Sequence, residues 1–222
     1  MAGMPPHPAE AEFVIATDAA GFDVRRRSAY DLGIAASDAI LPLVVLVHGP
    51  VRGGGPRPRE WPVYQGYGSL LTRAGLAAAV ADLDFTSVEA LSKPTAQLDE
   101  IVDAARSEPG VDGEKVVIWG FSGGARLVGR WIEEPPCWLR GISLTYPVAA
   151  PVSRVQVPIV LTRVGLERPA IEATVERLLA LTTHAEVINV PNGHHGFDTL
   201  DHNDESRRAV TSAVAAVTRL LS

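Results

Sequence analysis

A serine lies between glycines in the stretch Gly120-Phe-Ser-Gly-Gly124, directly after the apolar run Val116 to Trp119. A tight turn from a strand into a helix presents a serine hydroxyl above the sheet and strains the backbone at that residue. Small residues two before and two after the serine let the strand and the helix pack closely, as Gly120 and Gly124 would. Ser122 is therefore a candidate nucleophile, and the alternative is a glycine-rich turn that only caps a helix.

A serine hydroxyl is a weak nucleophile at neutral pH, so Ser122 needs a base and an acidic group that orients the base. Two histidines occur in the stretch Asn192-Gly-His-His-Gly-Phe-Asp198, after the last expected strand. Loops at the carboxyl ends of parallel strands gather along one edge of a sheet, so this loop can reach the serine. We favour His195 as the general base and expect His194 to point elsewhere. The pair is a poor metal site because nothing supplies a third ligand.

The orienting acid should follow another strand end, between the serine and the histidine in the chain. Glu167 comes three residues after the apolar run Val157 to Val164, with Gly165 making the turn, and it is our candidate. Alternatively, Glu167 is an exposed charge at the start of the next helix, with no part in the reaction. Three other carboxylates stay open as alternatives, two along that helix and one in the histidine loop: Glu172, Glu176 and Asp198.

Negative charge on a carbonyl oxygen needs preorganised N–H donors, each worth about a hundredfold or more in rate. One donor is the backbone N–H of Gly123, directly after the candidate nucleophile. The second should come from the loop after His48-Gly49. Since Pro50 has no N–H, we assign the second donor to Val51.

Four further residues are assigned to substrate binding: Arg52, Trp61, Tyr64 and Phe121. Trp61, Tyr64 and Tyr67 belong to a glycine- and proline-rich stretch, residues 50–68, that we expect to be irregular. Their rings would form an apolar wall beside the oxyanion donors, or would anchor the stretch to the domain. Arg52 would attract a substrate carboxylate, unless it is a solvated surface arginine.

The elements that must position these residues follow an alternating pattern. Apolar β-like runs alternate with segments of helical spacing, which is typical of an α/β fold with a mostly parallel central sheet and helices on both faces. The apolar run Leu41 to Gly49 predicts a central strand buried on both faces. Residues 12–30 predict a hairpin with its turn at Gly21 and Asp23. The connection 147–156 is too short for an inserted cap domain, so we expect an open site.

The remaining elements are read from the same periodicity. The expected helices cover 69–75, 87–107, 124–134, 169–181 and 204–221. The expected strands after the central one cover 76–85, 116–120, 139–146, 157–164 and 185–190.

Composition limits the function classes. With 222 residues, 46% of them hydrophobic, the chain has material for one domain, which we place at 12–222 after a flexible tail at 1–11. The start of the chain has no features of a secretion signal and no apolar run could cross a bilayer, so we expect a cytoplasmic protein without a membrane partner. A net charge of −6 with scattered basic residues argues against a nucleic-acid partner. Monomer and homodimer both stay open.

Serine, acid and histidine in this chain order, with His48-Gly49 after the central strand, resemble the α/β-hydrolase fold from about Glu12 onward. The strand endings Leu144-Thr-Tyr-Pro-Val148 and Gly193-His-His-Gly-Phe-Asp198 look most like the dienelactone hydrolase branch and its serine esterase relatives. Two departures are visible. Dienelactone hydrolases proper use a cysteine nucleophile, whereas this chain has Ser122. Their acid is usually aspartate, whereas this chain has Glu167.

The resemblance implies a serine hydrolase that acts on small ester or lactone-like molecules and needs no cofactor or metal. Ser122 would attack the carbonyl after His195 takes its proton, Gly123 and Val51 would hold the oxyanion, and water would release the acyl group. The alternative is a binding or interaction protein that keeps this fold with an idle triad. Pro50 is the residue that favours this alternative, because it removes a donor.

Overall fold

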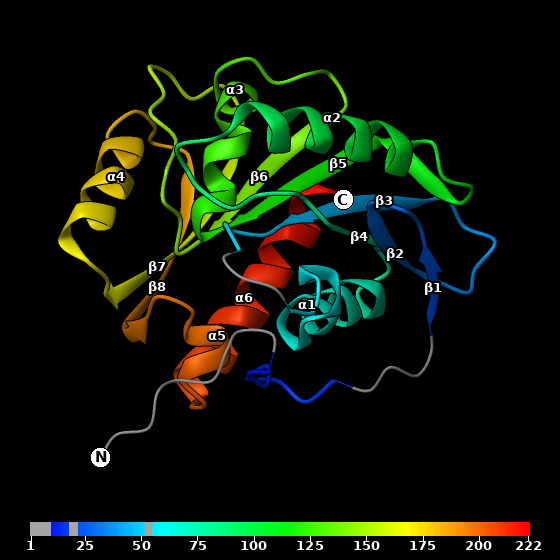
Figure 1. The fold of residues 1–222 in the computed structure, drawn as a ribbon, viewed down its shortest axis with the longest axis horizontal. Helices are drawn as coiled ribbons and strands as arrows, with labels where there is room; N and C mark the ends of the chain where they lie inside the picture. The colour runs from blue at the N-terminus through cyan, green and yellow to red at the C-terminus, as the bar shows by residue number, and fades with distance from the viewer. Residues whose placement is uncertain (1–9, 18–21, 52–54) are drawn as a thin grey trace.

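The structure is a computed structural model that describes residues 10–17, 22–51 and 55–222. Within these ranges the strands are β1 (Phe22–Arg26), β2 (Tyr30–Ala35), β3 (Leu41–Val47), β4 (Ala77–Ala81), β5 (Val111–Phe121), β6 (Leu139–Thr145), β7 (Ile159–Leu166) and β8 (Ala185–His194). They form one sheet in the order β1-β2-β4-β3-β5-β6-β7-β8 (Figure 1). β2 pairs antiparallel with β1 and β4, and every other pair is parallel.

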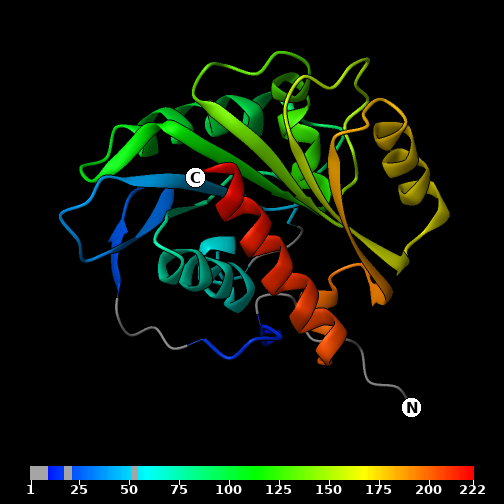
Figure 2. The ribbon, with the colours of Figure 1, turned by 180° about the vertical axis from the view of Figure 1, so that it is seen from behind.

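Helices cover both faces of this sheet (Figures 1 and 2). One face carries α2 (Ser92–Arg106), α3 (Gly129–Glu133) and α4 (Pro169–Leu179). The other face carries α1 (Pro62–Arg73) and α6 (Asp204–Leu220). The short helices are η1 (Pro58–Glu60), η2 (Ser122–Val128) and α5 (Phe197–Leu200). The predicted layers of helix, mostly parallel sheet and helix are confirmed.

β3 is the central strand and contributes to two hydrophobic cores. Leu43, Val45 and Val47 pack on the side of α2 and α3, and Val44 and Leu46 pack on the side of α1 and α6. All five side chains are fully buried. A continuous apolar run is required here because successive strand residues point to opposite faces, and both faces are covered.

The N-terminal hairpin lies later in the chain than predicted. β1 and β2 pair so that Arg26 faces Asp31, which places the turn at 27–29 and puts Asp23 inside a strand. Gly21, the other predicted turn residue, lies outside the described residues. The cause is the strict alternation of buried side chains at Tyr30, Leu32 and Ile34, which forms the inner face of β2.

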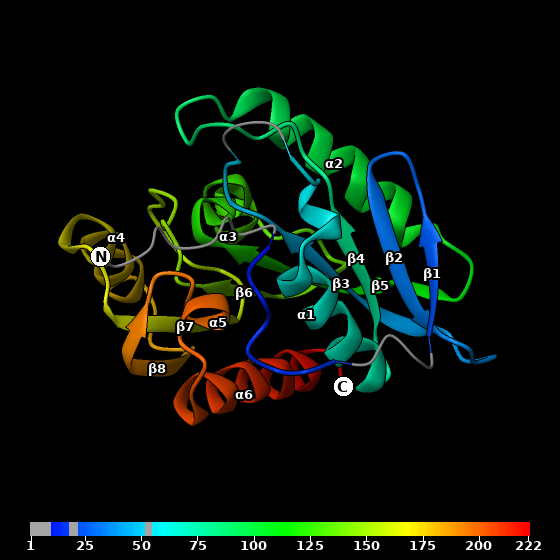
Figure 3. The same cartoon turned by 60° about the horizontal axis from the view of Figure 1, so that its bottom comes forward.

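Residues 10–17 form no strand and instead pack against the helices at the far side of the sheet. Figure 3 shows this segment running between α5 and α1. The Phe13 ring lies 5.0 Å from the Tyr67 ring of α1, and the Val14 N–H donates to the Asp198 carbonyl of α5. Ala11 is buried as well. Residues 1–9 of the predicted tail lie outside the described residues.

The glycine- and proline-rich stretch predicted to be irregular contains η1 and the beginning of α1, so that prediction was wrong. Pro58 and Pro62 stand at the first positions of these helices, where a missing N–H costs nothing and the fixed backbone angle suits a helix. Gly66 lies inside α1 because a Cβ there would come within 2.2 Å of the Phe13 ring. Prolines and a glycine, which resemble helix breakers in the sequence, therefore begin both helices and allow α1 to pack closely against Phe13.

The connection between β6 and β7 carries no helix, and the described residues contain no cap domain. This agrees with the prediction of an uncapped fold. None of the helices in the described ranges combines the length and apolarity needed to traverse a lipid bilayer.

Candidate active site

Ser122 occupies the junction between β5 and η2, with a backbone φ of 51°. Such a left-handed conformation is strained for a residue with a side chain. A Cβ on Gly124 would lie 2.4 Å from the Val47 carbonyl oxygen, and one on Gly120 would lie 3.1 Å from the Ala125 nitrogen. The predicted strained turn, with glycines that allow a close approach of strand and helix, is present.

A chain of two hydrogen bonds starts at the serine. The Ser122 Oγ lies 2.7 Å from His195 Nε2, and His195 Nδ1 lies 2.5 Å from Glu167 Oε2. Because the carboxylate can only accept, the proton of the neutral ring belongs on Nδ1, which leaves Nε2 to accept the serine proton. The Glu167 carboxylate is buried, and the His195 ring is partly exposed. The arrangement is suited to removing a proton from the hydroxyl.

The register of β7 and β8 brings the acid and the histidine together. Leu166 pairs with His194, after an irregularity that follows Val164, so the next residue on each strand is Glu167 and His195. A Cβ on Gly165 would lie 2.1 Å from the Pro191 carbonyl oxygen, which only glycine avoids. These strand ends lie at the edge of the sheet where β5 delivers the serine.

The alternative acids are engaged elsewhere. Glu172 and Glu176 on α4 both face Arg163, at 3.6 and 2.8 Å. His194 points away from the serine, as expected, and its Nδ1 lies 2.9 Å from Asp201. Among the carboxylates weighed from the sequence, Glu167 alone contacts the His195 ring in the described part of the chain.

Asp198, the third alternative acid, has a different place. It is fully buried and accepts hydrogen bonds from Tyr67 at 3.1 Å and Tyr146 at 3.0 Å. Burial raises the pKa of the Asp198 carboxyl to about 7. The Tyr146 ring in turn packs 4.9 Å from the His195 ring. Asp198 therefore holds a tyrosine that supports the histidine, a role that the sequence analysis missed.

Tyr146 comes directly after β6, and its backbone φ of 36° is also strained. One feature of the sequence could have indicated this role: Tyr146 is an aromatic residue at the end of a predicted parallel strand, close to the candidate nucleophile. Its neighbour two residues on, Val148, donates its N–H to the Ser122 carbonyl at 3.0 Å. This bond ties the turn after β6 to the turn that carries the serine.

The two residues assigned as oxyanion donors fare differently. A Cβ placed on Gly49 would lie 3.1 Å from the Ser122 Cβ and 3.3 Å from the Gly123 nitrogen, so the loop after β3 lies against this turn. The Val51 N–H, however, already donates to the Phe85 carbonyl at 2.8 Å. The assignment of Val51 was therefore wrong, because that hydrogen bond uses the donor that an oxyanion would need.

A cleft of about 230 Å³ opens beside the serine and the histidine. Trp61 and Tyr64 line it, and both are also largely buried, so they form a wall of the cleft and anchor the segment at once. The rest of the described lining comes mainly from small or apolar residues: Ala11, Gly49, Pro50, Val63, Tyr146, Gly196, Asp198, Thr199 and Leu200.

The other two residues assigned to substrate binding do not join this lining. Phe121 is 1% exposed and stacks on Trp119 beneath the cleft, with ring centroids 5.6 Å apart. It supports the floor and is not among the residues that line the cleft. Arg52 lies outside the described residues.

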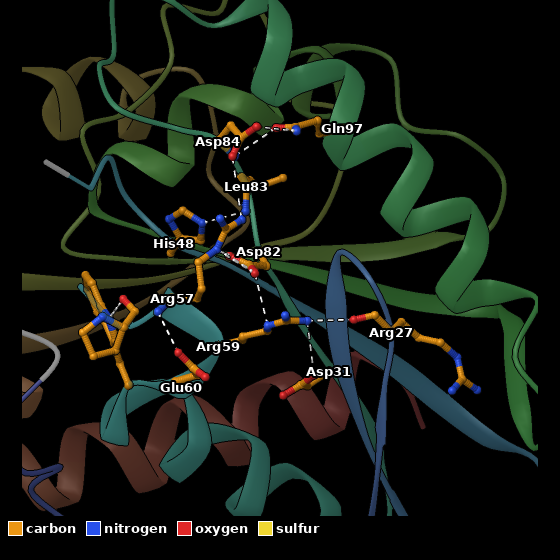
Figure 4. Close-up of polar contacts among 12 residues, drawn as sticks. Arg27, Asp31, His48, Arg57, Arg59, Glu60, Asp82, Leu83, Asp84 and Gln97 are labelled. Carbon is orange, nitrogen blue, oxygen red and sulfur yellow. Dashed lines mark hydrogen bonds and ion pairs between the residues drawn. The ribbon is translucent and has the colours of Figure 1, made fainter. Parts of the chain in front are cut away.

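A buried carboxylate fixes the segment that carries the cleft wall (Figure 4). Asp82, just after β4, lies 2.8 Å from Arg57 Nε and 3.1 Å from Arg59 Nε. Glu60 accepts the Arg57 backbone N–H at 2.9 Å. Because η1 lies directly before Trp61, these contacts set where the wall stands relative to the sheet.

His48 performs a similar task for the loop after β3. Its Nδ1 donates to the Gly49 carbonyl at 2.6 Å, and its Nε2 accepts the Leu83 N–H at 3.0 Å (Figure 4). Burial lowers the pKa of His48 to about 4, so the ring is neutral and both bonds persist at neutral pH. Within the described residues no group of three or more histidines, cysteines and carboxylates could hold a metal ion.

No protein-family model matches the chain, and no curated protein matches it. Among solved structures, the chain is 17% identical to carboxyl esterase 2 of the fungus Tuber melanosporum, over 99% of this chain and 94% of that one, with a TM-score of 0.72. It is 15% identical to a bacterial heroin esterase, over 94% and 87%, with a TM-score of 0.74. It is also 15% identical to MGS-M1, an α/β-hydrolase enzyme from a Medee basin deep-sea metagenome library, over 90% and 98%, with a TM-score of 0.65. These likenesses show that the chain has the α/β-hydrolase fold.

Proposed function

We propose that this α/β-hydrolase-fold chain is a serine hydrolase that cleaves small carboxylic esters or lactone-like substrates through an acyl-enzyme. The observation that supports it most is the hydrogen-bonded chain from Ser122 through His195 to Glu167, open to a cleft. The compared structures that are named as esterases add support at the level of the fold.

In the proposed mechanism the Ser122 oxygen bonds to the ester carbonyl carbon while its proton moves to His195 Nε2. The carbonyl π pair moves onto oxygen, where the Gly123 N–H would stabilise it. Glu167 stabilises the imidazolium and holds the ring in place. When the oxyanion collapses, the leaving alkoxide takes the proton from His195. A water molecule then attacks the acyl-enzyme, with His195 again accepting and returning the proton.

The cleft favours a small and uncharged substrate. Its described lining includes no lysine or arginine, and Trp61, Val63 and Leu200 present apolar surface. A volume of about 230 Å³ is below the range of about 300 to 1,000 Å³ that is usual for drug-sized ligands. Short acyl groups and small lactone-like rings therefore fit the proposal best, and membership of the dienelactone hydrolase branch is part of the proposal.

The second candidate is a binding protein with an idle triad. Two facts favour it: Pro50 has no N–H, and the Val51 N–H is already bonded to Phe85. An oxyanion site with one donor would slow acylation by about a hundredfold or more. The two candidates differ in whether Ser122 reacts.

A fluorophosphonate probe and a panel of short nitrophenyl esters test the proposal. We expect the probe to label Ser122, located by mass spectrometry, and we expect Ser122→Ala to abolish both labelling and ester turnover. Ser107→Ala is the matched control, because Ser107 is an exposed residue that caps the C-terminus of α2, does not line the cleft, and should not change either readout. A folded wild-type protein that is inert to the probe and to the whole panel would favour the binding protein.

A further inference from the structure

The loop after β3 leaves the oxyanion site short of a backbone donor. Pro50 has no N–H, and the Val51 N–H is bonded to the Phe85 carbonyl at 2.8 Å. Gly123, which lies against this loop, supplies one donor by its position after the nucleophile. A tetrahedral oxyanion is normally held by two donors. The second donor must therefore be sought among the side chains of the cleft.

Tyr64 is the cleft side chain best placed for this. It lines the same cleft as Ser122 and His195, and it is only 5% exposed. Its ring meets the Phe121 ring edge to face, with centroids 5.4 Å apart and an interplanar angle of 86°. Since Phe121 directly precedes the serine, this contact fixes the tyrosine relative to the turn that presents the nucleophile.

The Tyr64 hydroxyl lies near the backbone of Gly49, and this contact lowers the pKa of the phenol. A contact with that effect stabilises the phenolate, so the Gly49 N–H rather than its carbonyl faces the phenol oxygen. Gly49 itself lies against Ser122 and Gly123: a Cβ placed on it would lie 3.1 Å from the Ser122 Cβ and 3.3 Å from the Gly123 nitrogen. A facing N–H makes no use of the O–H proton of Tyr64, which stays available to an acceptor in the cleft.

The hydroxyl also stays protonated. Burial raises the pKa of Tyr64, and the negative charge of Asp198 raises it further. Together these effects outweigh the lowering by Gly49, so the pKa stays above its ordinary value. A buried neutral phenol whose ring is held by its neighbours is a preorganised donor, because no water reorganises when charge develops.

We infer that the Tyr64 hydroxyl is the second oxyanion donor, completing with the Gly123 N–H the site that the loop after β3 leaves open. The inference rests on the proposed function. As Ser122 bonds to the carbonyl carbon and His195 receives the serine proton, the carbonyl π pair moves onto oxygen and accepts from Tyr64 and Gly123. The tyrosine keeps its proton throughout, and its bond to oxygen weakens again when the alkoxide leaves.

Tyr64→Phe tests this by deleting one oxygen atom. We expect kcat on a short nitrophenyl ester to fall by about 100-fold to 1,000-fold, with little change in KM, because the lost bond forms with the oxyanion. The affinity for a trifluoromethyl ketone, which forms a tetrahedral oxyanion on the serine, should fall by a similar factor. Tyr30→Phe is the matched control, because Tyr30 is equally buried but bonds to Glu108 at 2.9 Å, away from the cleft.

The outcomes separate the two proposals. If wild-type protein hydrolyses esters and Tyr64→Phe folds yet keeps kcat within about threefold, the tyrosine is not a donor and the serine hydrolase stands. If wild-type protein is inert to the ester panel and the probe, the proposed function itself fails. Should Tyr64→Phe not fold, a structure of wild-type protein with the trifluoromethyl ketone decides. An oxyanion bonded to the Tyr64 hydroxyl supports the inference, and one bonded only to backbone N–H groups overturns it.

Discussion

Glu167 and His195 are 28 positions apart in the chain, and yet Glu167 Oε2 lies 2.5 Å from His195 Nδ1. The register of the sheet sets this distance, because the preceding residues Leu166 and His194 pair across β7 and β8. The carboxylate is further held by the Arg168 N–H, which donates to its second oxygen at 2.8 Å. The strand register and the Arg168 N–H therefore hold the Glu167 side chain in place against the imidazole. Removing its charge should lower the reaction rate more than it disturbs the fold.

Glu167→Gln is expected to lower kcat by about 100-fold to 10,000-fold, because an amide cannot stabilise the imidazolium and can favour the wrong tautomer. Steady-state kinetics on a short nitrophenyl ester measure the change. Glu172→Gln is the control, since Glu172 is half-exposed and faces Arg163. Equal losses in the two variants would refute the assignment of the acid.

Asp82→Asn is expected to destabilise the cleft wall, because Arg57 and Arg59 would then share a neutral partner. Both arginines are partly exposed, so we expect a loss of about 1 to 3 kcal/mol in the free energy of unfolding. KM should rise, since Trp61 follows this segment, and kcat should fall as well, since Tyr64 follows it too. Asp103→Asn, in which the exposed Asp103 of α2 loses its pair with Arg106, is the control and should change neither the unfolding free energy nor the kinetics appreciably. Unfolding in urea and steady-state kinetics give both.

Asp198 predicts a particular dependence of stability on pH. Its pKa is raised from 3.8 to about 7, so folding favours the protonated form. The stability from this group is fully present below pH 3.8 and is lost as pH rises through 7, with a total effect of about 4 kcal/mol. Asp198→Asn removes the titration while keeping an oxygen that accepts from Tyr67 and Tyr146.

The unfolding free energy of wild type should therefore fall steadily relative to that of Asp198→Asn as the pH rises from 4 to 7. Taking the difference removes the contribution of other carboxylates, such as Glu108, whose pKa is lowered by its hydrogen bond with Arg27. Urea unfolding at several pH values measures it. A difference that stays constant across this range would contradict a buried carboxyl that is protonated in the folded state.

The candidate nucleophile, base and acid could be chosen from the sequence because each follows a strand end, and parallel strands deliver their ends to one edge. The strain at Ser122 and the tight approach at Gly124 also follow from the local pattern. The position of the strained turn at the nucleophile can therefore be predicted from the neighbouring residues alone.

What the sequence could not supply depends on distant partners. The donor of Val51 is taken by Phe85, which belongs to the chain after β4. Asp198 stands in the histidine loop, where the sequence leaves it as an alternative acid, but Tyr67 and Tyr146 enclose it from two other elements. The helix from Pro62 was hidden because Gly66 is there for the packing of Phe13, which no local rule reveals.

The segment that begins at Glu10 also bears on how the protein should be handled in the laboratory. Ala11 forms part of the cleft lining, and Val14 is bonded to the same residue, Asp198, whose carboxylate holds two tyrosines. An affinity tag fused immediately before Ala11, or a truncation that removes Val14, would alter the cleft lining and the support of the histidine together. A purification handle belongs after Ser222, which is exposed at the end of α6.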